Sequence, residues 1–76
     1  MHKEQRSLIR VKSGETVHIS SIHAGKNMNG RLAAMGLLPD TEVTVISNGY
    51  PGPFVIIVRN TRMMLGKGMA QKIMVR

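Results

Sequence analysis

The apolar residues of this chain come in short runs, and a segment rich in glycine, proline or asparagine separates each run from the next. Within the runs apolar and polar residues alternate, as Val17 and Ile19 do with His18 and Ser20, which is typical of a half-buried β-strand. The pattern predicts five strands, over residues 16–22, 41–47, 54–59, 62–65 and 73–75. Short strands in a chain of 76 residues favour a mainly β fold, a small closed barrel, because closure removes unpaired strand edges.

One segment between the first two strands is typical of a helix. Asn27 or Asn29 can cap its start, because a side-chain oxygen there accepts a free backbone N–H. Leu32 and Met35 lie three residues apart and share one face, and Gly36 suits the left-handed end of a helix. We therefore expect one short helix of about two turns, held in place by packing rather than by its own propensity.

The third and fourth predicted strands meet at Asn60-Thr61, a two-residue connection typical of a hairpin turn. This turn predicts four opposed pairs: Ile57 with Met64 and Arg59 with Arg62 on the outside, and Val58 with Met63 and Ile56 with Leu65 on the inside. Alternation along all the strands, together with the helix, predicts the core residues Leu32, Met35, Leu37, Val43, Val45, Phe54, Ile56, Val58, Leu65, Ile73 and Val75.

The outward positions of the same strands predict an apolar patch with a basic rim. Its centre is formed by Val55, Ile57, Met64 and Met74, and its rim by Arg59, Arg62, Lys72 and Arg76. An apolar centre with a charged rim is typical of a surface that binds another protein. The alternative is that these residues are the ordinary exterior of a small barrel, in which case the turn containing Leu38 is the next candidate for partner binding.

Net charge limits the class of partner. The chain has 11 Lys and Arg against 4 Asp and Glu, a formal charge of +7, so an anionic partner is expected. The chain has no cysteine, which excludes disulfides and thiolate metal sites and suits a reducing cytosol. No segment approaches the roughly 20 apolar residues of a membrane span. Nucleic acid is a weaker expectation, because Tyr50 is the only candidate exposed ring for stacking on a base.

Candidate catalytic and metal-binding residues are few. Asp40 and Glu42 stand beside a turn, no phosphate-binding glycine loop occurs, and we expect no enzymatic activity and no catalytic residues. His2, His18 and His23 are the imidazoles available to a divalent transition metal, which commonly takes histidine together with carboxylates. Their spacing forms no ligand set, so no cofactor and no metal residue is assigned, and metal binding stays an alternative.

The order of several short motifs resembles the ferrous iron transport protein A (FeoA) family. The resemblance rests on Arg31-Leu32, Gly36-Leu37-Leu38-Pro39-Asp40, Val43-Thr44-Val45, Gly52-Pro53, Ile56-Ile57-Val58, Leu65 and the final Ala70, Ile73 and Val75. This sequence departs from the family at Asp40 and Asn60, where glycine is usual, but both residues tolerate left-handed backbone. The resemblance implies an SH3-like β-barrel. It also implies a small cytoplasmic accessory protein that acts on the ferrous iron permease, a membrane protein with a cytoplasmic G-domain.

These observations predict a single domain over residues 1–76, with residues 1–6 as a flexible tail. Its predicted function is to dock on the permease and modulate ferrous iron uptake, in the cytoplasm or at the membrane through that partner. Two alternatives remain: a basic SH3-like module that binds nucleic acid, and a stand-alone relative of the C-terminal domain of metal-dependent repressors that binds a transition metal. A homo-oligomer is also compatible with the apolar patch.

Overall fold

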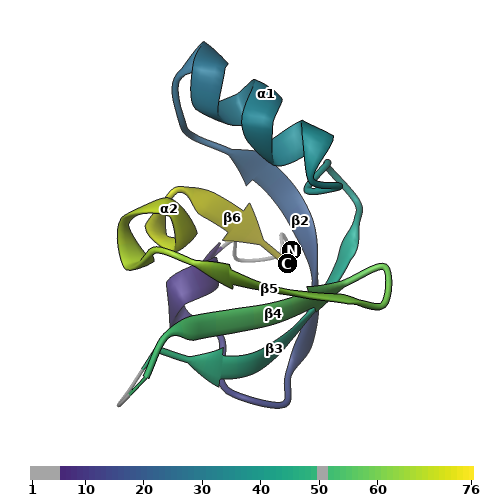
Figure 1. The fold of residues 1–76 in the computed structure, drawn as a ribbon, viewed down its shortest axis with the longest axis vertical. Helices are drawn as coiled ribbons and strands as arrows, with labels where there is room; N and C mark the ends of the chain where they lie inside the picture. Colours follow the sequence, from purple (N-terminus) through teal and green to yellow (C-terminus); the bar gives the residue numbers. More distant parts are fainter. Residues whose placement is uncertain (1–5, 50–51) are drawn as a thin grey trace, which may run out of the picture.

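The computed structural model describes residues 6–49 and 52–76, and these form a six-stranded antiparallel sheet in the order β1-β6-β2-β3-β4-β5 (Figure 1). The elements are β1 (Arg6–Ser7), the 3-10 helix η1 (Leu8–Arg10), β2 (Thr16–Ile22), α1 (Lys26–Ala34), β3 (Glu42–Asn48), β4 (Phe54–Val58), β5 (Thr61–Leu65), α2 (Lys67–Gln71) and β6 (Ile73–Val75). The mainly β, SH3-like fold is confirmed. Strand β1 is not among the predicted strands, and the prediction that Arg6 belongs to a flexible tail is wrong, because Arg6 lies in this strand opposite Val75.

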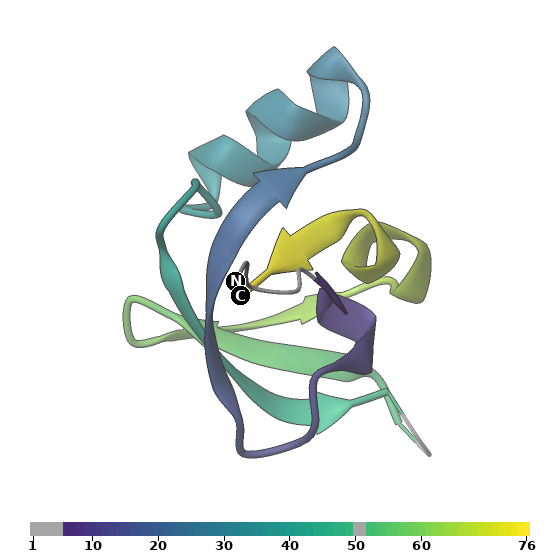
Figure 2. The ribbon, with the colours of Figure 1, turned by 180° about the vertical axis from the view of Figure 1, so that it is seen from behind.

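Strand β2 joins the two halves of the sheet. Thr16, Val17 and His18 pair with β3, whereas Ile19, Ser21 and Ile22 pair with β6, and a bulge lies between Ile19 and Ser21. A bulge bends its strand and increases the local twist. Both ribbon views show β2 as a long curved strand that leaves the β3–β4–β5 layer and runs up beside β6, toward α1 (Figures 1 and 2).

The core confirms ten of the eleven residues predicted for it. The buried apolar residues are Leu8, Val11, Val17, Ile19, Leu32, Leu37, Val43, Val45, Phe54, Ile56, Val58, Leu65, Ala70, Ile73 and Val75. Met35 is the exception, with 43% of its surface exposed. It is the C-cap residue of α1, where the helix ends, so sharing a face with Leu32 three residues earlier does not carry it into the core.

The two ends of α1 differ in how well the sequence predicts them. The helix begins at Lys26 after Gly25, and no side chain caps it, so the predicted asparagine cap is wrong. Its far end confirms the role of Gly36, which has a φ of 93°. The Leu37 N–H donates to the Leu32 carbonyl at 2.9 Å, and the Gly36 N–H donates to the Ala33 carbonyl at 2.9 Å, which is a Schellman motif. Leu32 and Leu37 are both buried, as this motif favours.

The hairpin register predicted from Asn60-Thr61 is wrong by two residues on β5. The turn residues are Arg59 and Asn60, with φ of 53° and 65°, and Val58 pairs with Thr61. Positive φ at both central residues is typical of a type I′ turn, and a β-branched threonine disfavours that conformation. Because the shift is two residues, the side chains that stay in the two strands keep their predicted faces but acquire different partners, whereas Arg59 moves into the turn.

Candidate functional site

The outer face of the β4–β5 hairpin carries three of the four apolar residues predicted for the patch. Val55 lies directly opposite Met64, and Ile57 lies opposite Arg62, in place of the predicted Ile57–Met64 and Arg59–Arg62 pairs. Met64 is 68% exposed, the most exposed of the large apolar residues described, while Val55 and Ile57 are half-buried. We call these four residues, Val55, Ile57, Arg62 and Met64, the hairpin face.

The remaining predicted patch residues lie elsewhere in the sheet. Met74 is half-buried on β6, which pairs with β1 and β2, so two strands separate it from β4 in the sheet order. Arg76 forms an ion pair with Asp40, and Lys72 follows α2, where its carbonyl accepts the His23 N–H at 2.7 Å. Arg59 is exposed in the hairpin turn. The structure therefore gives Met74, Lys72 and Arg76 no place beside the hairpin face in the sheet.

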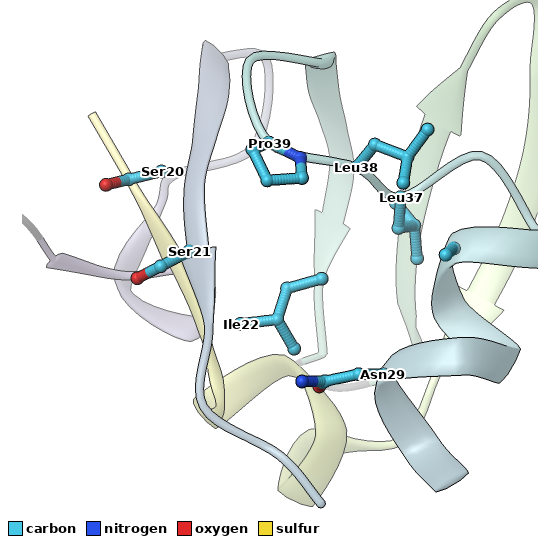
Figure 3. Close-up of a pocket in the computed structure, with 8 residues that line it drawn as sticks. Ser20, Ser21, Ile22, Asn29, Leu37, Leu38 and Pro39 are labelled. Carbon is cyan, nitrogen blue, oxygen red and sulfur yellow. The ribbon is translucent and has the colours of Figure 1, made fainter. Parts of the chain in front are cut away.

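A pocket of 310 Å³ lies between the end of β2 and α1 (Figure 3). It is lined by Ser20, Ser21, Ile22, Asn29, Ala33, Leu37, Leu38 and Pro39. In the close-up, Ile22 and Asn29 point toward one another across the space, whereas the side chains of Ser20 and Ser21 point away from it. Leu38, the second candidate for partner binding, is 40% exposed at this pocket.

Backbone hydrogen bonds hold the Leu38-containing turn against β2. The Asp40 N–H donates to the Ile19 carbonyl at 2.6 Å, and the Ile19 N–H donates to the Thr41 carbonyl at 2.9 Å. Asp40 has a φ of 70°, as the sequence predicts for this turn. Together with the Schellman motif, these bonds fix both ends of the turn, so backbone hydrogen bonds hold this wall of the pocket in place.

The sequence pattern does not predict the pocket itself, because three separate segments form it. One signal was present in the helix. Asn29 precedes Leu32 by three residues and Ala33 by four, so it shares their inward face. Its side-chain Oδ1 is buried and accepts no hydrogen bond. A buried acceptor without a donor is unusual in a folded protein and calls for an explanation.

Two of the four acidic residues are neutralised by arginines. Glu15 pairs with Arg6 and Asp40 pairs with Arg76. The hydrogen bond from the Arg6 side chain, and then the Lys12 backbone N–H, hold the pKa of Glu15 below its usual value. Glu42 forms no ion pair within residues 6–49 and 52–76. Most of the remaining surface charge is therefore positive.

The histidines do not converge. His18 is exposed on β2, as predicted, and the Ser21 hydroxyl lies 2.9 Å from Nε2 of His23. In the part of the chain that the structure describes, no group of three or more histidine, aspartate or glutamate side chains could hold a metal ion. His2 and Tyr50 lie outside the described residues. None of the described helices is long and apolar enough to cross a bilayer.

Comparisons with known proteins agree on one family. The family model of the FeoA domain matches residues 6–76. A putative Fe(2+) transport protein A from Methanocaldococcus jannaschii is 38% identical over 64 residues, which cover 84% of this chain and 77% of that protein. The crystal structure of an iron uptake regulatory protein (FeoA) superposes with a TM-score of 0.85 at 31% identity, covering 97% of each chain.

The same fold occurs in a longer protein of another class. A manganese-dependent transcriptional repressor superposes with a TM-score of 0.87 at 23% identity, covering 99% of this chain and 42% of the repressor. At that identity the likeness concerns the fold alone.

Proposed function

We propose that this chain, which belongs to the FeoA family, serves ferrous iron transport by docking on the cytoplasmic part of the ferrous iron permease. The family supports a role in Fe²⁺ transport as an accessory protein. The observation that supports docking is the hairpin face, where Met64 is 68% exposed beside its partner Val55. A solvated apolar side chain on a strand surface gains free energy when a partner covers it.

The charge around the hairpin face suits an acidic partner surface. Arg62 lies opposite Ile57 and is exposed, and Arg59 is exposed in the adjoining turn. Buried apolar and arginine contacts usually carry most of the energy of an interface, while charges at its rim mainly set the encounter rate. We therefore expect the apolar residues to determine affinity and the two arginines to make binding depend on salt. This docking would hold the protein in the cytoplasm, at the membrane surface.

The test is co-purification of the permease with the tagged chain from detergent-solubilised membranes. Met64→Ser should leave the fold intact, because the side chain is mostly solvated, and should abolish recovery of the permease. Leu38→Ser, a change of the same kind at a residue 40% exposed, is the matched comparison. Loss in the Leu38 variant alone would move the contact to the pocket, and normal recovery with both variants would refute docking through either surface.

A further inference from the structure

We infer that the pocket between β2 and α1 binds an extended acidic segment of another protein, which pairs with β2 as an added strand. One apolar side chain of that segment enters the pocket between Ile22, Ala33 and Leu38. This site shares no residue with the hairpin face. Four features of the described residues support it: an open strand edge, a rigid apolar pocket, an unpaired acceptor and the local charge.

The first feature is the open edge of β2. On the β6 side, the His18 N–H donates to the Arg76 carbonyl at 3.0 Å and the His23 N–H donates to the Lys72 carbonyl at 2.7 Å. Neighbouring residues of a strand direct their backbone groups to opposite edges, so those of Ile22 face the pocket. On that side, β3 pairs only with residues 16–18, and within the described chain no strand pairs beyond Ile19. An edge of this kind accepts an extended peptide as a further strand.

The second feature is the shape of the pocket next to this edge. Its volume of 310 Å³ is at the small end of ligand sites, which run from about 300 to 1,000 Å³, so it suits one side chain rather than a large cofactor. Ile22, Ala33 and Leu38 provide apolar walls, and the hydrogen-bonded turn holds Leu38 in place. A strand added along β2 would direct alternate side chains into this space.

The third feature is Asn29. Its backbone N–H is satisfied by the Gly25 carbonyl at 2.8 Å, but its side-chain Oδ1 is buried without a donor. In Figure 3 this amide extends from α1 toward Ile22 with its nitrogen leading. Because Oδ1 is closed off from solvent, a turn of the amide about its Cβ–Cγ bond is needed to present this atom to the pocket, where a peptide N–H or a side-chain hydroxyl would supply the missing donor. Asn29 is therefore the residue that would distinguish a hydrogen-bonding ligand from a purely apolar one.

The fourth feature is charge. Helix α1, one wall of the site, has no acidic residue, and its Lys26 lies three residues before Asn29 on the same face. Asp40, at the far end of the pocket turn, is already paired with Arg76. Acidic residues beside the inserted side chain are thus attracted to this wall. A second copy of this chain is a poor occupant, because two chains of charge +7 repel each other.

The direct test is a titration of the isotopically labelled protein with a synthetic peptide, monitored by NMR. The probe is a short peptide of alternating glutamate and valine with a central leucine. Amide shifts should change at Ser20, Ser21 and Ile22, and the side-chain amide of Asn29 should shift with them. Two control peptides separate the contributions: lysine in place of glutamate removes the charge match, and N-methylation at the leucine removes a strand hydrogen bond. Each should weaken binding by roughly tenfold or more.

Protein variants complete the test. Asn29→Leu removes the acceptor while keeping the size of the side chain, so it should weaken the peptide roughly tenfold and leave the chain folded. Asn27→Leu is the matched control, since Asn27 lies on the same helix but is exposed, and it should bind normally.

Three outcomes would overturn the proposal: equal binding by the Asn29 variant and the parent, equal binding of the N-methylated peptide, or shifts confined to β4 and β5. Concentration-dependent self-association with the same shifts would instead assign the pocket to a second copy. The permease plays no part in this titration, so its result is independent of docking at the hairpin face.

Discussion

Truncation of Ile56 to alanine is the most direct test of the packing that holds this small barrel together. Ile56 is fully buried on β4, between Val45 of β3 and Met63 of β5. The change deletes three carbon atoms, which corresponds to about 2.4 kcal/mol of transfer free energy at about 0.8 kcal/mol for each buried methylene. The cavity left behind adds to this cost, so the total should lie within the roughly 2–5 kcal/mol seen for such truncations.

This loss is large relative to the total unfolding free energy of a domain of this size. At about 0.05–0.15 kcal/mol per residue, 76 residues give an unfolding free energy of about 4–11 kcal/mol. For domains of this length, each kcal/mol shifts Tm by about 4–8 °C, so Ile56→Ala should lower Tm by at least about 8 °C. The change removes a large part of the total stability.

Thermal and urea unfolding followed by far-UV circular dichroism would measure the effect, and needs no tryptophan, which the chain lacks. The neighbouring Ile57→Ala is the matched control. Ile57 is half-buried on the opposite face of β4, so the same change should cost clearly less. A cooperative Ile56→Ala variant with an unchanged Tm, or one no less stable than Ile57→Ala, would refute the assignment of the two faces of β4.

Three further predictions concern the backbone and one ion pair. Gly36→Ala should destabilise by about 1–2 kcal/mol in urea unfolding, because alanine disfavours the left-handed backbone that ends α1. Arg59→Gly should be neutral or stabilising by up to about 1 kcal/mol, whereas Thr61→Gly should destabilise; the reverse order would place the hairpin turn at Asn60-Thr61. The pKa of Glu15 is lowered in the folded state, so its stabilisation is present above the ordinary value of 4.5 and is lost as pH falls below it. When pH is lowered from 6 to about 3, the Tm of Glu15→Gln should therefore fall less than the Tm of the parent. Equal falls in Tm would contradict the Arg6 pairing.

The sequence was sufficient for the parts of the fold that depend on local patterns. Alternation identified Val43 and Val45 as inward residues, and Gly36 marked the end of the helix because few other residues adopt its φ. The hairpin register was not determined by the same means. Asparagine tolerates either central position of a two-residue turn. Whether Arg59 or Thr61 is the second turn residue therefore depended on which of them adopts positive φ.

Contacts between distant segments account for what the sequence did not predict. Leu8 and Val11 are buried because η1 packs against α2, about sixty residues later in the chain, and no local period indicates this. The pocket required the end of β2, one face of α1 and the turn after it to meet. Only Leu38 was identified in advance, as an exposed apolar residue in a turn, whereas Asn29 resembled an ordinary helix cap.

The position of β6 determines how this chain must fold. The strand lies between β1 and β2, so Arg6 opposes Val75 and the sheet is completed by segments at opposite ends of the domain. The entropy of closing so long a loop is lost before these pairings contribute stability. Folding is therefore expected on the scale of about milliseconds to seconds, as for other barrels of non-local topology, rather than at the speed of a helical domain. Until β6 is in place, the edge of β2 that it covers stays open, and it is there that a slowly folding chain is most exposed to pairing with another molecule.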